Sequence, residues 1–456
     1  MAHDVRLIRS PISVAGMVLT TISAVLFLVV FLAELFGLDT NPYIGLIFFL
    51  LLPTLFIVGL AMIPIGASIE RRRRAAGKAP SSVQWPRLDL NDPRQRGIAV
   101  SIFVLTMTNV VIVSLAAYRG VEYMESPQFC GQVCHTVMEP EYVAHREGPH
   151  SRVVCVECHV GSGAQSFVYY KLNGMRQLAH LVSGNYPRPV PSPVFNMRPA
   201  RSTCEMCHWS EKFHGDKVDI VPEYASDEKN TNNSTRLVMH VGGGLPEFGL
   251  GAGVHWHNNS EIEIDFVATD AKRQEIPYVR LKDKGGQIHE FRTPTVTDAQ
   301  IASGERRRMD CIDCHNRPTH AFFATPERAV DAAIARGAIA AELPFARRQA
   351  VEALKAEYAD RAAAERGIGD RLRAFYGAKA GATTSPQKAD VDQLVTTTQF
   401  LYARSVFPAM KVSWGVHADN LGHTDAPGCF RCHDDQHKAA DGRVIKQDCD
   451  LCHEIQ

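Results

Sequence analysis

Cysteine and histidine recur in this chain in one fixed pattern. Its 12 cysteines form six pairs, and a histidine directly follows the second cysteine of every pair. Five pairs read Cys-x-x-Cys-His, whereas the first has one residue more between its cysteines. A disulfide framework requires no histidine at this position, so the pattern argues against one. The pairs are Cys130 and Cys134, Cys155 and Cys158, Cys204 and Cys207, Cys311 and Cys314, Cys429 and Cys432, and Cys449 and Cys452.

Cys-x-x-Cys-His is the attachment signature of haem c. Two thiols at this spacing reach two vinyl groups of one porphyrin as thioethers, while the adjacent imidazole reaches the iron from one side. The sequence therefore predicts six covalently bound haem c groups. Zinc is the alternative, but a zinc site would not require a histidine after every pair. The predicted proximal iron ligands are His135, His159, His208, His315, His433 and His453.

The second axial ligands are expected among the other histidines. Removing the six proximal residues and His3 from the 19 histidines leaves 12 candidates. Local context favours six of these, because they lie beside a motif or in a glycine-rich turn that can present a ring to a flat porphyrin. The predicted distal ligands are His150, His240, His257, His320, His423 and His437.

Met138 gives the first motif a further candidate ligand, since it lies three residues after His135. A thioether ligand would raise the potential of this haem relative to one held by two histidines. The alternative is that Met138 packs against the porphyrin without binding iron. The wider cysteine spacing and this methionine both set the first site apart from the other five.

Three segments near the N-terminus carry no charged side chain: residues 12–33, 40–69 and 97–118. Each is long enough to cross a membrane, because a helix needs about 20 residues to span the hydrocarbon core. The first segment could be a cleaved signal peptide, but it lacks a small-residue cleavage site and the second segment follows almost at once. The sequence therefore predicts three transmembrane helices.

Basic residues predict how these helices are oriented. Arg6 and Arg9 precede the first segment, and arginines 71–74 follow the second. The chain is expected in the inner membrane of a bacterium. Because Lys and Arg stay on the cytoplasmic side, we expect the N-terminus in the cytoplasm and the chain after Arg119 in the periplasm. The arginine run could instead bind anionic lipid or nucleic acid. With 49 basic and 49 acidic side chains the net charge is zero, and we expect no nucleic-acid partner.

The predicted fold class is three N-terminal transmembrane helices followed by an extracytoplasmic multihaem cytochrome c region, mainly α and loop with a small β insertion. A β-hairpin is expected around Lys284-Gly285-Gly286. A helix is expected to begin at Pro326, which suits a first helical position. The predicted divisions are a membrane anchor at 1–118, a three-haem domain at 119–211, a β-rich insertion with distal histidines at 212–300, the fourth haem with a helical segment at 301–378, and a two-haem segment at 379–456.

Several stretches resemble the NapC/NirT/NrfH family of membrane-anchored multihaem quinol dehydrogenases. Residues 125–210 carry FCGQVCHTVMEPEY, PHSRVVCVECHVGSGAQSFVYYKLNGMRQ and YPRPVPSPVFNMRPARSTCEMCHW. The later MHVGG, HWH, MDCIDCHNRPTH and GHTDAPGCFRCHD are similar to the longer, three-span members of the family. Small members have one span and four haems, and the longer members carry seven haems. This chain has six motifs, so its electron route and partner do not follow from the family alone.

The resemblance implies that membrane quinol is the substrate and that a periplasmic c-type cytochrome or reductase accepts the electrons. In the family, a methionine near the first motif binds iron and a lysine hydrogen-bonds the quinol. Carried over, these are Met138 and Lys171, with Glu139 and Arg176 as the next catalytic candidates. Here the methionine lies one place further on than in small members. Lys171 could also be an anchor to lipid phosphate.

Two other functions stay open at this point. The chain could be a non-catalytic electron relay between membrane complexes, anchored by its spans to the lipid bilayer. It could also be a multihaem terminal reductase, which needs a haem with an open distal position. All six motifs end in histidine, whereas the pentahaem nitrite reductases are known for a site that ends in lysine.

Overall fold

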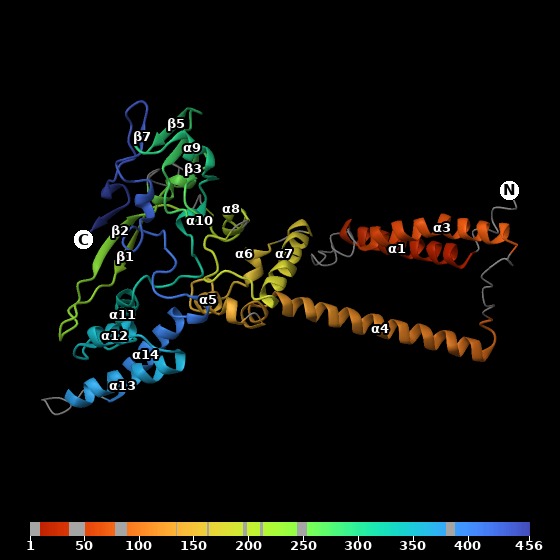
Figure 1. Ribbon diagram of the computed structural model, residues 1–456, viewed down its shortest axis with the longest axis horizontal. Coiled ribbons are helices and arrows are strands. Elements are labelled where there is room, and N and C mark those ends of the chain that lie inside the picture. Colours follow the sequence, from red (N-terminus) through yellow and green to blue (C-terminus); the bar gives the residue numbers. More distant parts are fainter. Residues whose placement is uncertain are drawn as a thin grey trace. The chain divides into compact units, whose positions relative to one another are not determined.

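The computed structural model forms two compact units, residues Met1–Met124 with Val160–Asn185 and residues Glu125–His159 with Tyr186–Gln456 (Figure 1). The described residues are 10–35, 51–77, 89–133, 135–161, 164–194, 198–209, 213–243, 253–379 and 388–456.

The first unit consists of helices α1 (Pro11–Leu35), α3 (Leu52–Ala75), α4 (Pro93–Glu125) and α7 (Ala164–Val182). Helices α1 and α3 pack closely because small residues face each other. A Cβ atom added at Gly16 would lie 2.6 Å from the carbonyl oxygen of Gly59, so both positions require glycine. The Ser13 hydroxyl donates to the carbonyl of Ile63 at 2.9 Å across the same interface.

Helices occupy the described parts of all three predicted spans. Among the described residues, Thr54–Ala75 is the one helix long and apolar enough to cross a membrane by length and composition, and Pro11–Leu26 is a shorter apolar helix. Residues 40–50 of the predicted second span lie outside the described residues. Helix α4 covers the third segment but does not meet the same criterion of length and apolar composition. Three membrane crossings therefore stay a prediction.

In the second unit, the haem motifs lie on short helical turns. The first motif forms a π-helical turn, η2 (Phe129–Val133), which leads into α5 (His135–Arg146). A π-turn closes over one residue more than an α-turn, so it accommodates the extra residue of this motif. The other motifs lie on or beside α6 (Cys155–His159), α8 (Ala200–Cys204), α10 (Cys311–Cys314), η7 (Gly428–Arg431) and η8 (Cys449–Leu451).

Two antiparallel sheets follow from the alternating sequence. One has the order β1 (Asp216–Val221), β2 (Thr235–His240), β8 (His453–Ile455). The other has the order β6 (Glu305–Arg308), β3 (Glu263–Ala268), β4 (Tyr278–Lys282), β5 (Ile288–Arg292), β7 (Lys438–Ala439). The predicted hairpin is confirmed, since β4 pairs with β5 in the register Tyr278 to Arg292.

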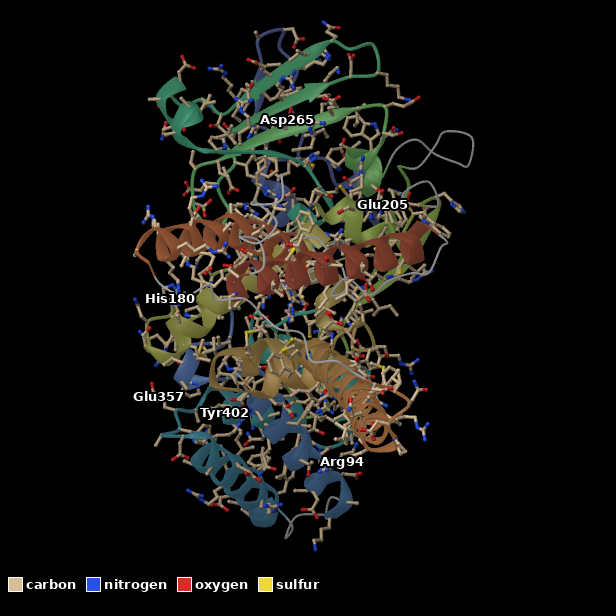
Figure 2. All side chains as sticks on the ribbon, turned by 90° about the vertical axis from the view of Figure 1, so that its right-hand side faces the viewer. Arg94, His180, Glu205, Asp265, Glu357 and Tyr402 are labelled. Carbon is tan, nitrogen blue, oxygen red and sulfur yellow. The ribbon has the colours of Figure 1, made fainter. Side chains whose placement is uncertain are left out.

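Each sheet includes a strand from the C-terminal segment, so residues 212–300 do not form sheets by themselves. On the five-stranded sheet, Asp265 of β3 lies opposite Arg280 of β4 and Arg308 of β6 (Figure 2). Its carboxylate accepts hydrogen bonds from these arginines at 2.8 and 2.6 Å. Such cross-strand pairs of opposite charge fix the register of the sheet.

The largest hydrophobic core of the second unit lies among α11 (Pro326–Ala335), α12 (Ala346–Lys355), α13 (Arg361–Lys379) and α14 (Lys388–Ser405). Thr325 caps α11 by accepting a hydrogen bond from the backbone N–H of Arg328, and Pro326 occupies the first turn as predicted. Tyr402 of α14 packs into this core (Figure 2). The remaining short helices are η5 (Val254–Asn258), α9 (Asp298–Ser303) and η6 (Pro408–Met410).

Candidate haem sites

Cysteines of consecutive motifs lie next to each other. Cys130 donates a hydrogen bond to Cys155, which lowers the pKa of the Cys155 thiol to about 7. Cys311 likewise donates to Cys204 and lowers the pKa of that thiol. In the haem-bound protein these thiols become thioethers, so the contacts report the nearness of the sites. Burial raises the pKa of three further thiols, and a cysteine of the neighbouring motif adds to the rise: Cys158 near Cys204, Cys314 near Cys429, and Cys452 near Cys429.

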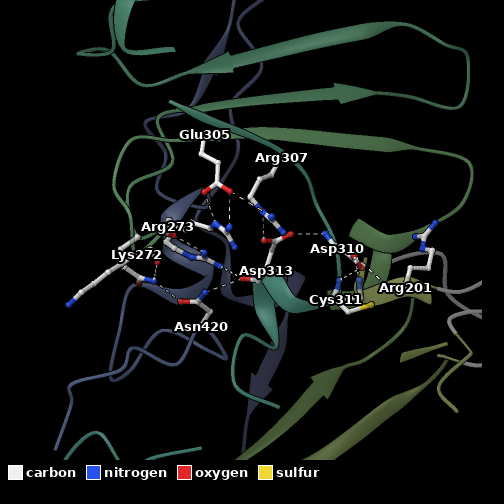
Figure 3. Close-up of polar contacts among 12 residues, drawn as sticks. Arg201, Lys272, Arg273, Glu305, Arg307, Asp310, Cys311, Asp313 and Asn420 are labelled. Atoms are coloured by element: carbon white, nitrogen blue, oxygen red, sulfur yellow. Dashed lines mark hydrogen bonds and ion pairs between the residues drawn. The ribbon is translucent and has the colours of Figure 1, made fainter. Parts of the chain in front are cut away.

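Two aspartates of the fourth motif join the third, fourth and fifth motifs (Figure 3). The Asp310 carboxylate caps α10 by accepting from the backbone N–H of Cys311 at 2.7 Å, and it also accepts from Ala200 at the start of α8 at 2.7 Å. The backbone carbonyl of Asp313 accepts from the Arg431 guanidinium of the fifth motif at 2.6 Å. The Asp310 carboxylate, the Asp313 carbonyl and the Arg431 guanidinium therefore hold consecutive motifs together.

Five motif histidines lie opposite a second histidine. Two imidazoles that bind one metal ion at about 2 Å, each with a ring radius of about 1 Å, have ring centres about 6 Å apart. The observed ring-centre distances are 6.2 Å for His159 and His320, 6.0 Å for His208 and His150, 6.2 Å for His315 and His255, 5.8 Å for His433 and His257, and 6.1 Å for His453 and His423.

Hydrogen bonds at the other ring nitrogen also suit iron binding. Nδ1–H donates to a backbone carbonyl, at distances of 2.8 to 3.1 Å, in His150, His255, His257 and His320. Metal-binding histidines commonly donate their second N–H in this way, which fixes the ring and directs Nε2 to the metal. The residues present therefore fit a haem held between two histidines.

Burial lowers the pKa of His320 to about 4. It also lowers the pKa of His159, His257 and His315. These rings are consequently neutral near pH 7, and the neutral imidazole is the form that binds a metal ion.

Four of the six predicted distal histidines belong to these pairs, whereas His240 and His437 do not in the part of the chain described. His437 is buried, with Nδ1 2.8 Å from the Asp434 carboxylate and Nε2 2.7 Å from the Ile276 carbonyl. Both of its nitrogens are therefore in polar contacts, and the structure pairs His437 with no motif histidine among the described residues. His240 uses Nδ1 on Asp216 at 2.9 Å, beside the sixth motif.

His255 is the partner that the sequence analysis missed. It lies two residues before His257 in η5, and each ring faces a different motif histidine. In a 3-10 helix two residues advance by about 240°, so alternate side chains point in different directions. The two histidines of the His-Trp-His sequence were the feature from which two ligands could have been predicted.

The candidates for quinol chemistry lie on two helices. Met138 is half-buried on α5, and the Glu139 carboxylate accepts from Arg361 at 2.6 Å. Arg176 is exposed on α7. Lys171 also belongs to α7, but its side chain, like Cys134 and the His135 ring, lies outside the described residues.

Comparisons with known proteins fit this arrangement. Residues 93–189 match the N-terminal region of the NapC/NirT cytochrome c family. The chain is 40% identical over 449 residues to the cytochrome c-type protein ImcH of Geobacter sulfurreducens, covering 98% of this chain and 88% of that protein. The chain belongs to the NapC/NirT cytochrome c family. Membership of this family makes it a membrane multihaem cytochrome that takes part in electron transfer, with covalently bound haem c. No solved structure matches the chain.

Proposed function

We propose that this NapC/NirT cytochrome is a quinol dehydrogenase with six haems, which passes electrons from membrane quinol to a periplasmic acceptor. The observation that carries the proposal is the order of the motifs, because a cysteine of each motif lies near a cysteine of the next from Cys130 to Cys452. Such a row has two ends. The irregular first motif suits the quinol end, and the sixth motif suits the acceptor.

The chemistry divides between the haems and the polypeptide. Haem, when bound, supplies a one-electron acceptor at each motif. Oxidation of one quinol gives one quinone, two electrons and two protons, so the electrons leave one at a time and the protons pass to water outside the membrane. Lys171 would hold a quinol oxygen through its ammonium group, and Met138 would set the first iron apart by a thioether. Glu139 and Arg176 remain secondary candidates.

We further propose three membrane crossings, with the N-terminus in the cytoplasm and the motifs in the periplasm. A reporter fused after Arg74 should read as cytoplasmic, because arginines 71–74 are retained on that side. A reporter joined through a linker after Gln456 should read as periplasmic. Alkaline phosphatase and green fluorescent protein fusions measure the two sides. A reporter found on the opposite side at either position would show that the protein has one membrane crossing fewer than proposed.

The test of the proposed function is the reduction of the purified protein by a menaquinol or ubiquinol analogue. The haem absorption spectrum should change on mixing, without any added partner. A relay between other complexes would require such a partner before the spectrum changed. A terminal reductase would instead consume nitrite or hydroxylamine once its haems were reduced.

A further inference from the structure

The ring pairs account for the second to sixth motifs, whereas the ring of His135 in the first motif lies outside the described residues. Among the described histidines outside these pairs and motifs, His289 and His437 have both ring nitrogens in polar contacts. His214 is exposed, and His180 lies on α7 in the other unit. His240 lies next to the sixth motif, where its backbone N–H donates to the carbonyl of Cys452. The described histidines of the second unit that remain are His145 and His417.

His417 has the properties of a ligand without its metal. Its residue is only 9% exposed, yet Nε2 has no hydrogen-bond partner. A buried polar atom without a partner costs free energy, about 1–3 kcal/mol, so such atoms usually have a function or an absent partner. Burial lowers the pKa of His417 to about 4, which keeps the ring neutral.

The segment around His417 packs near α5, the helix that begins at the first motif. Val416 packs on the cluster of Phe407, Met410 and Val412, and Val137 and Val143 of α5 pack on the same cluster. The charge of Glu141, also on α5, acts on the His417 ring. Glu141 lies three residues after Met138, so the two share one face of α5. His417 therefore lies near α5, the helix that carries Met138, the candidate ligand of the first motif.

His145 is the competing residue, since its Nδ1 is also buried without a partner. However, its Nε2–H donates to the Val153 carbonyl at 2.9 Å, whereas every pair with an assigned hydrogen bond keeps Nε2 for the iron. Its ring also lies 6.1 Å from His320, beside the second site. His145 thus supports the second site.

We propose that His417 is an axial iron ligand of the first haem, through Nε2. The other axial ligand then comes from the motif side, from His135 or Met138. This proposal concerns the haem alone and does not depend on quinol oxidation.

The test compares His417→Ala and His417→Met with His145→Gln, all purified with their haems. His417→Ala should keep six haems by mass spectrometry but convert one low-spin haem to high-spin in the electron paramagnetic resonance spectrum. Added imidazole should restore the low-spin signal, because it can enter the space left by the ring. His417→Met should stay low-spin with an altered spectrum. His145→Gln should leave the signal of the first haem unchanged.

A variant that lacks the first haem shows whether His417 acts on that haem. Cys130→Ala with Cys134→Ala removes the first haem, and His417→Ala in that background should cause no further spectral change. Three results would overturn the proposal: an unaltered spectrum in His417→Ala, a high-spin haem that persists without the first motif, or loss of the first haem's signal in His145→Gln.

Discussion

A protein with Cys311→Ala and Cys314→Ala should accept electrons from quinol at its first three haems and deliver them much more slowly to the fifth and sixth. Consecutive motifs lie next to each other, with Cys204 near Cys311 and Cys314 near Cys429. Removing the fourth haem therefore opens a gap that electrons must tunnel across, and tunnelling slows steeply with distance. In stopped-flow absorption, three of the five remaining haems should be reduced quickly, and the other two ~100-fold or more slowly, about 2.7 kcal/mol of barrier.

The matched control removes the haem at the end of the row. Cys449→Ala with Cys452→Ala also leaves five haems, but all five should be reduced in the fast phase because the row is uninterrupted. The Asp310 and Asp313 hydrogen bonds do not involve the thiols and persist in the first variant. Fast reduction of all five haems in the Cys311 and Cys314 variant would show that the route is branched.

Lys171→Arg and Lys171→Met should both keep six haems but slow quinol-driven haem reduction by ~10-fold or more, about 1.4 kcal/mol of barrier. Loss of the quinol's hydroxyl protons requires a polar group that holds its oxygen in place. Arginine keeps the charge but changes the donor geometry, whereas methionine removes the donor. Rates at several quinol concentrations measure the effect on binding and on reduction separately.

Arg119→Met is the matched control for the loss of a cation. Arg119 lies on α4 at the end of the third apolar segment, where its exposed side chain pairs with Glu122. Such an exposed pair contributes little, so this variant should show normal quinol kinetics. Normal kinetics in both Lys171 variants would instead assign Lys171 to lipid anchoring and direct the search to Glu139 or Arg176.

The features that the sequence predicted correctly are encoded over short distances. The turn at Lys284-Gly285-Gly286 joins β4 to β5, and the Thr325-Pro326 start of α11 depends on one cap and one fixed φ angle. The haem motifs are equally local, because five or six consecutive residues carry both thiols and the predicted iron ligand. Spacing alone predicts such features.

The partners of the motif histidines could not be predicted with the same accuracy, because tertiary packing brings them together. His320 follows the fourth motif but faces His159 of the second. His437 follows the fifth motif by four residues and was chosen for that nearness, yet hydrogen bonds occupy both its nitrogens. His417 gave no local signal, and only its burial and unpartnered nitrogen distinguish it.

The C-terminal strands β7 and β8 determine when the two sheets can be completed during folding. Strand β2 pairs with β8, and β5 pairs with β7, across long stretches of sequence. As the chain is synthesised from its N-terminus onward, both sheets keep an open edge until the segment 438–455 has been made. Pairings between distant segments also form slowly. The five-stranded sheet can therefore gain its last strand before the sixth motif is complete, whereas the three-stranded sheet closes only with the strand that begins at His453 of that motif.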